Sequence, residues 1–138
     1  MLFFVNLNFW YVNDQRLFFN CVESNEVLKL KFRKLHEAVV DNVNPANIID
    51  FLFQAAVIRD DDVSALTFED DPQQQCRDLL DLLHTSENPR AFVELYTAVT
   101  AESHLQWLIE RIDKFTDQSV IDLLQQMYIS EPTGQRVF

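Results

Sequence analysis

Residues 71–83 read DPQQQCRDLLDLL, and this stretch marks both the start of a helix and its buried side. Asp71 is a residue type that caps helix starts, because its carboxylate accepts hydrogen bonds from backbone N–H groups of the first turn. Pro72 suits the first helical position, where no hydrogen bond is lost. The apolar residues that follow recur at helical spacing, namely Cys76, Leu79, Leu80 and Leu83. The stretch predicts an amphipathic helix with one side in a core.

The same pair of residue types occurs twice more, as Asn44-Pro45 and Asn88-Pro89. We expect each pair to begin a helix, with Asn as the N-cap and Pro as the first helical residue. Apolar stripes at helical spacing follow both pairs: Ile48, Ile49, Leu52, Phe53 and Ala56 after the first, and Phe92, Leu95, Tyr96 and Val99 after the second.

Further patterns complete the helical reading. A first helix from residue 26 is indicated by the stripe Leu28, Phe32, Leu35 and Val39. Asp60-Asp61-Asp62 places acids in the first turn of a short helix that ends near Phe68, where they favour the positive end of the helix dipole. Helices from Ser103 and from about Asp117 carry the apolar sets Leu105, Leu108, Ile109, Ile112 and Val120, Leu123, Leu124, Met127.

Short connections force neighbouring helices to run antiparallel. We therefore predict an all-α, antiparallel six-helix bundle over residues 26–115, followed by an extra C-terminal amphipathic helix and tail over residues 116–138. The composition agrees with one such domain. The chain has 138 residues and a single Gly, which argues against a turn-rich all-β fold and against a glycine-rich phosphate loop.

Residues 1–25 form an aromatic N-terminal extension whose composition differs from the rest. Two β-prone runs, 7–12 and 16–22, flank residues 13–15 and are compatible with a hairpin. A poorly ordered or helical extension and a membrane-targeting role are the alternatives. The apolar runs are far shorter than the roughly 20 residues that span a bilayer, and no basic region precedes them. No membrane association is expected.

No catalytic site, metal site or cofactor is predicted, and we expect the protein not to be an enzyme. Cys76 and His84 stand eight residues apart on one predicted helix. That spacing is about 12 Å along the axis, which is too far for proton transfer. Residues 60–71 are similar to a calcium loop in oxygen spacing, but Ala65 stands where the sharp turn needs Gly. The scattered His and Cys lack zinc-ligand spacing.

The net charge of −11 makes nucleic acid and anionic lipid poor partners, because binding them needs clustered Lys and Arg. With only two cysteines, Cys21 and Cys76, we expect free thiols and a reducing, cytoplasmic location. Bases gather on the first predicted helix: Lys29, Lys31, Arg33 and Lys34. Acids gather around the second and third: Asp50, Asp60, Asp61, Asp62, Glu69, Asp70 and Asp71. Charge runs are usually only solvated surface, so a binding role for them is a hypothesis at this point.

The order of these features resembles the caspase recruitment domain (CARD) of the death-domain superfamily. Residues 35–52 resemble the end of the first helix and the second helix of that family. Residues 56–62 resemble its junction into the third helix, with Ala56 where Gly is frequent. Helices four, five and six of the family are matched by residues 76–83, 89–99 and 104–109. The turn before the last of these, at residues 101–103, and the aromatic extension depart from the family pattern.

The resemblance implies homotypic assembly, in which a basic patch on helices one and four of one domain meets an acidic patch on helices two and three of another. It nominates a basic face of Lys29, Arg33, Lys34 and Arg77. It nominates an acidic face of Asp50, Asp60, Asp61, Asp62 and Glu69.

The implied role is a binding module in apoptotic or innate-immune signalling that recruits a procaspase or an adaptor, and that can also self-associate. Because Arg77 is the lone base of helix four, we expect the chain to act mainly as the acidic partner. The alternative is a decoy that occupies a partner domain without passing on a signal.

Overall fold

The computed structural model describes residues 25–129, and every regular element within them is helical. The leading helix covers residues 25–34. It is followed in this part of the chain by α2 (His36–Asn42), α3 (Pro45–Gln54), α4 (Asp60–Thr67), α5 (Pro72–His84), α6 (Ala91–Thr100), the 3₁₀ turn η1 (Ser103–Leu105), α7 (Gln106–Lys114) and α8 (Gln118–Ile129). The predicted all-α bundle is confirmed. The hairpin considered near the N-terminus lies outside the described residues.

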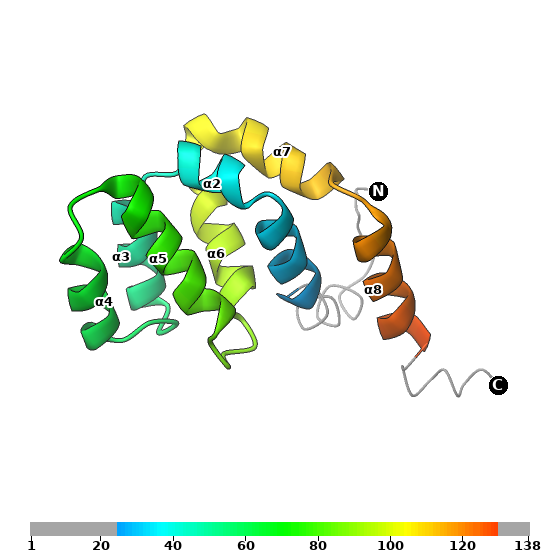
Figure 1. Cartoon of the computed structure of the whole chain (residues 1–138), viewed down its shortest axis with the longest axis horizontal. Coiled ribbons are helices and arrows are strands. Elements are labelled where there is room, and N and C mark those ends of the chain that lie inside the picture. Colours follow the sequence, from blue (N-terminus) through cyan, green and yellow to red (C-terminus); the bar gives the residue numbers. More distant parts are fainter. Residues whose placement is uncertain (1–24, 130–138) are drawn as a thin grey trace.

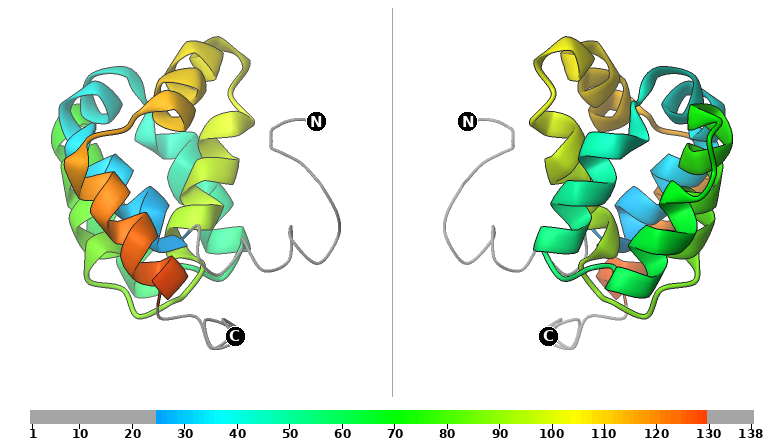
Figure 2. Two further views of the ribbon diagram at one scale, coloured as in Figure 1. Left: turned by 90° about the vertical axis from the view of Figure 1, so that its right-hand side faces the viewer. Right: turned by 90° about the vertical axis from the view of Figure 1, so that its left-hand side faces the viewer.

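The helices pack as a bundle around α3, which contacts α4, α5 and α6. α2 packs on α5, and α6 packs on α7. Figure 1 shows α4 at one end of the molecule and α8 at the other, with α7 lying across the bundle. The views in Figure 2 place α8 beside the leading helix. None of the helices in this part of the chain combines the length and apolar character that a membrane span requires.

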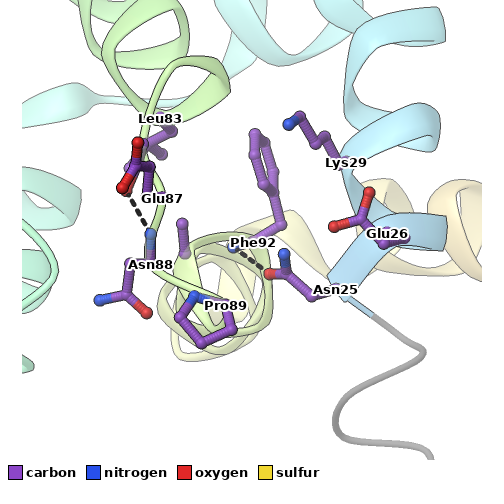
Figure 3. Close-up of a pocket in the computed structure, with 10 residues that line it drawn as sticks. Asn25, Glu26, Lys29, Leu83, Glu87, Asn88, Pro89 and Phe92 are labelled. Atoms are coloured by element: carbon purple, nitrogen blue, oxygen red, sulfur yellow. Dashed lines mark hydrogen bonds between the residues drawn. The ribbon is translucent and has the colours of Figure 1, made fainter.

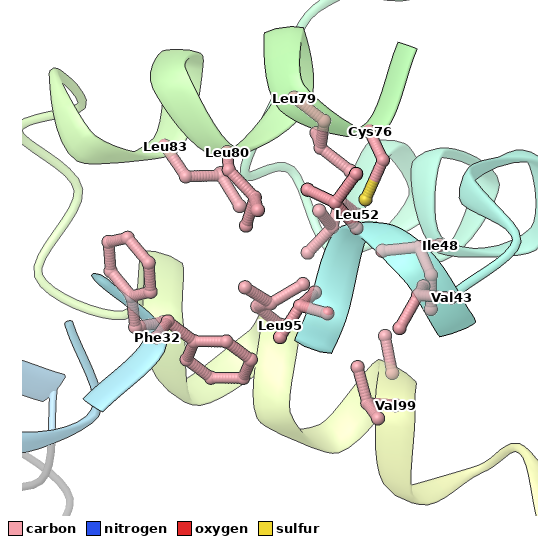
Figure 4. Close-up of a cluster of buried hydrophobic side chains, with 14 of the residues drawn as sticks. Phe32, Val43, Ile48, Leu52, Cys76, Leu79, Leu80, Leu83, Leu95 and Val99 are labelled. Atoms are coloured by element: carbon pink, nitrogen blue, oxygen red, sulfur yellow. The ribbon is translucent and has the colours of Figure 1, made fainter. Parts of the chain in front are cut away.

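The core is built largely from the apolar stripes that the sequence predicted, but Phe53 and Ala56, expected in the stripe after Asn44, are exposed. Buried side chains from several helices meet there, among them Phe32, Ile48, Leu52, Leu79, Leu80, Leu83, Leu95 and Val99 (Figure 4). The ring of Phe32 lies against that of Phe92, with centroids 5.9 Å apart. Each large side chain removed from water in this way contributes about 1.5–3 kcal/mol to folding.

Two of the three predicted Asn-Pro or Asp-Pro helix starts are confirmed. The Asn44 side chain accepts from the backbone N–H of Ala46 at 3.1 Å, and α3 begins at Pro45. The Asp71 carboxylate accepts from the N–H of Gln73 at 3.3 Å, and α5 begins at the proline between them. Both caps are local, so the residues that form them are neighbours in the sequence.

The third predicted start is wrong by two residues. Asn88 accepts from the N–H of Arg90 at 2.8 Å and forms a turn, and α6 begins only at Ala91. The cap of α6 is supplied instead by Asn25, whose side-chain oxygen accepts from the N–H groups of Phe92 at 2.8 Å and of Val93 at 3.3 Å. Asn25 is only 5% exposed, so the leading helix holds the start of α6 through a buried hydrogen bond.

The first predicted helix is divided in the structure. Leu35 has φ −103° and ψ 22°, which separates the leading helix from α2. The two parts pack on different neighbours, since Phe32 lies on α6 while α2 packs on α5. The predicted stripe is nevertheless buried at Phe32, Leu35 and Val39. The bend at Leu35 therefore changes the direction of the helix axis, and the apolar residues on both sides of it remain buried.

The last two predicted helices form with adjustments. The helix expected from Ser103 begins as the 3₁₀ turn η1 and continues as α7. The C-terminal helix is present as α8, where Asp117 accepts from the N–H of Val120 at 3.0 Å. Of the stripe expected to face inward, Val120 is buried, whereas Leu124 remains 47% exposed. α8 is thus anchored to the bundle mainly at its first turn.

Candidate protein-interaction surfaces

The first turn of α4 presents three consecutive carboxylates at the positive end of the helix dipole. Asp62 is used locally: it accepts from the backbone N–H of Arg59 at 3.0 Å and lies 3.9 Å from the Arg59 guanidinium. Asp60 and Asp61 are exposed, and neither forms a hydrogen bond or ion pair with another residue in 25–129. These two carboxylates are therefore open to a partner.

The other two predicted acids lie on α3 and just beyond the end of α4. Asp50 is exposed on α3, which packs against α4, and it accepts from the side chain of Gln54 at 3.1 Å. Glu69 is half-buried just beyond the end of α4 and accepts from the backbone N–H of Asp71 at 3.1 Å. We call Asp50, Asp60 and Asp61 the open acids. Asp62 and Glu69 also hold the local backbone.

On the leading helix, Lys29 and Arg33 stand one turn apart. Neither forms an ion pair with another residue that the structure describes. Both cations act on His84 of α5. Burial lowers the pKa of His84 most, and the positive charges of Arg33 and Lys29 lower it further. The two cations therefore share the side of the leading helix that lies toward the end of α5.

The remaining two bases of the predicted basic face form ion pairs with acids of the same domain. Arg77 donates to both carboxylate oxygens of Glu37 on α2, at 3.0 and 3.4 Å, and this hydrogen bonding lowers the pKa of Glu37. Lys34 lies 3.7 Å from the carboxylate of Asp117, ahead of α8. The four predicted bases thus fall into two groups. Lys29 and Arg33 have no ion pair within the described residues, whereas Lys34 and Arg77 are paired with acids of the same domain.

One exposed residue was missed by the sequence reasoning. Phe68 follows the last turn of α4 and is 89% exposed, although it had been expected only to mark the end of that helix. It stands two positions after Leu66, which faces the core, so it lies off the buried side of α4. An aromatic residue off the apolar stripe, followed by the three acids of residues 69–71, was the available signal.

A catalytic use of Cys76 is disfavoured by its surroundings. The thiol is buried, and burial raises its pKa to about 11, so it is protonated at neutral pH and a poor nucleophile. His84 lies two turns further along the same helix, as expected. The calcium-loop reading fails because Asp60–Thr67 is helical. Within residues 25–129, no group of three His, Cys, Asp or Glu is placed to hold a metal ion.

A small pocket lies between the start of the leading helix and the loop from α5 to α6 (Figure 3). Its volume is about 240 Å³, which is below the range of about 300–1,000 Å³ typical of small-molecule sites. Leu83 and Phe92 supply apolar walls, while Glu26, Lys29 and Glu87 supply charges of both signs. A second pocket, beside Val57 and Leu82, has a volume of about 350 Å³ and falls within that range.

Comparison with known proteins gives one family match. The family model described as "Caspase recruitment domain" matches residues 29–112, from the leading helix into α7. No curated protein and no solved structure matches the chain.

Proposed function

Since the matched segment covers more than half of the chain, the protein belongs to the caspase recruitment domain family, and we propose that it acts as the acidic partner in assemblies with other CARDs. Domains of this family work by homotypic protein–protein interaction in signalling rather than by catalysis. To that general role the proposal adds that this chain supplies the acidic surface, which residues form it, and that the partner is a basic CARD.

The observation that carries the proposal is the pair Asp60 and Asp61, exposed at the N-terminus of α4 and without an internal partner in the described residues. Asp50 adds a third carboxylate on the adjacent α3. A net charge of −11 further favours approach of a basic surface. The opposite face is weaker, because Arg77 and Lys34 already lie beside Glu37 and Asp117.

The proposed partner is a CARD whose first and fourth helices carry exposed Lys and Arg, as in a procaspase or an adaptor. Opposed charges of this kind raise association rates and suppress wrong partners. A cytoplasmic site of action is part of the same proposal, as is a role in apoptotic or innate-immune signalling.

The test is a charge reversal with a matched control. Asp61→Lys places a cation opposite the basic partner and should weaken binding by roughly 1–3 kcal/mol at low salt and by less at high salt. Glu110→Lys makes the same change of net charge at an exposed position on α7, a helix that lies apart from α4 in Figure 1, and should leave affinity nearly unchanged. Equal losses in both variants would reduce the effect to net charge and contradict a defined acidic face.

A second candidate function is a decoy that binds one partner and stops assembly. The observation that favours it is the ion pairing of Arg77 and Lys34, which leaves only Lys29 and Arg33 open on the basic side. Growth of a filament needs two usable faces on each copy, whereas occupation of a partner needs one. A decoy would shorten filaments of a basic CARD when added below equimolar amounts, and a recruiting adaptor would instead seed them.

A further inference from the structure

Phe68 is exposed to a degree that its surroundings do not explain. The other large exposed hydrophobic side chains among the described residues, such as Trp107 at 46%, keep about half of their surface covered, whereas Phe68 is 89% exposed. Single exposed apolar residues are common on monomers. The backbone around Phe68, however, is held in place by several hydrogen bonds.

The backbone on both sides of Phe68 is fixed by hydrogen bonds. The Gln75 side chain donates to the carbonyl of Leu66 at 2.9 Å and to that of Glu69 at 3.1 Å. The Phe68 N–H itself donates to the carbonyl of Ser64 at 3.1 Å. An aromatic side chain presented from a backbone that is already ordered loses little entropy on binding.

Phe68 also continues the exposed side of α4 that begins with an open acid. Asp61, Ala65 and Phe68 follow one another at helical spacing, and all three are exposed. Asp61 and Phe68 are seven positions apart, which is about 10 Å along the axis of α4. Ala65 between them is small, so a partner can approach this side of α4 closely.

We propose that Phe68 is the apolar anchor of the acidic face and inserts into a hydrophobic pocket, rimmed by Lys or Arg, on the partner domain. The identity of that partner as a basic CARD rests on the proposed function. Acids surround the anchor, since Glu69, Asp70 and Asp71 follow it directly and Asp61 lies two turns before it. Aromatic residues at the centre of a contact often supply most of its affinity, and charges at the rim supply its selectivity.

The occupant is not a second copy of this chain. Pockets with apolar walls in the described residues lie beside Leu83 and Phe92 (Figure 3), beside Val57 and Leu82, and beside Leu66 and Leu82. The first carries Glu26 and Glu87 against Lys29, the second carries Asp62 beside Arg59, and the third carries Asp62 and Asp78. The acids that accompany Phe68 would therefore meet an acid at each of these pockets. A pocket with a purely basic rim complements the Phe68 corner better.

The experiment measures the affinity of the full chain for a purified CARD with basic first and fourth helices, at low and high salt. Phe68→Ala should weaken binding by about tenfold or more at both salt concentrations, because an apolar contact is not screened. Phe68→Leu keeps an apolar side chain and should lose less. Trp107→Ala, which removes an exposed aromatic from α7, is the matched control and should bind like the wild type.

The outcomes separate this inference from the proposed function. If Asp61→Lys weakens binding while Phe68→Ala does not, the anchor is refuted and the acidic face stands. If the wild type fails to bind the basic CARD at any salt, both are refuted. If the wild type self-associates and Phe68→Ala abolishes this, the occupant is a second copy and the commitment to a basic partner is wrong. Thermal melting of each variant verifies that the fold is intact, as expected for so exposed a side chain.

Discussion

Ala56 has φ 63° and is the only non-glycine residue with positive φ in the described chain. It follows α3, where its N–H donates to the carbonyl of Phe53 at 3.0 Å and that of Val57 donates to Leu52 at 2.9 Å. This pattern ends many helices and normally places Gly at the left-handed position. A side chain there costs about 1–2 kcal/mol. The sequence had marked the same residue as standing where related domains often have Gly.

We predict that Ala56→Gly stabilises the domain by about 1 kcal/mol, because relief of the left-handed strain exceeds the added freedom of the unfolded chain. Urea unfolding followed by circular dichroism measures the difference. Ala55→Gly is the control: its φ is −83°, so Gly gains nothing there and should destabilise by about 0.5–1 kcal/mol. Equal effects of the two substitutions would contradict the account of Ala56.

A second prediction at this scale concerns Asn25. Asn25→Ala leaves the N–H groups of Phe92 and Val93 without their acceptor, the first of them buried. The expected loss is about 1–3 kcal/mol, because an unsatisfied buried donor keeps its full desolvation cost. Asn88→Ala removes an exposed turn contact of similar length and should cost less. Hydrogen exchange at the amides of residues 92 and 93 should accelerate in Asn25→Ala alone.

At the scale of the element, α5 carries a histidine without a hydrogen-bonding partner. Both ring nitrogens of His84 are buried and unpaired within the described residues, and the ring lies on Phe92 with centroids 4.8 Å apart. The charged and titratable groups that act on it are Arg33, Lys29, His36 and Asp81. Burial and the cations lower the pKa of His84, so the folded protein favours the neutral ring.

This arrangement predicts that acid weakens the fold. As pH falls below about 6.5, His84 takes up a proton in the unfolded chain before it does so in the folded one, so stability declines down to the lower pKa of the folded state. Above about 6.5 this group adds no pH dependence. His84→Leu should flatten the fall in unfolding free energy between about pH 7.5 and about pH 5.5. His104→Leu, at an exposed position, should keep it; an unchanged slope in His84→Leu would contradict the prediction.

A helix boundary could be predicted from the sequence where the residues that fix it are neighbours in the chain. The caps at Asn44 and Asp71 act on residues two positions away, so both starts were predictable. The start of α6 was not, because its cap comes from Asn25, 67 residues before Phe92. The bend at Leu35 likewise depends on which neighbours the two parts meet, and the apolar stripe alone does not contain that information.

At the scale of the whole molecule, the sequence predicted which residues carry charge and which helices carry them. It did not predict which acids and bases form ion pairs with each other. Glu37 and Arg77 are 40 residues apart in the chain and form a two-point ion pair, so the strength of the basic face depends on the fold. The exposure of Phe68 is also a tertiary result, because only the packed structure shows that none of the helices within residues 25–129 covers it. The two nominated faces and the domain boundaries stay predictions.

The most direct test of the acidic-partner account is the mass of the complex measured by light scattering during size-exclusion chromatography. The full chain is run alone and mixed with a basic CARD, at about 0.1 M and about 1 M salt, where the screening length is about 10 Å and about 3 Å. The account predicts a joint peak at low salt that separates into its components at high salt. Two separate monomers at both salt concentrations would leave the fold intact and contradict assembly through the acidic face.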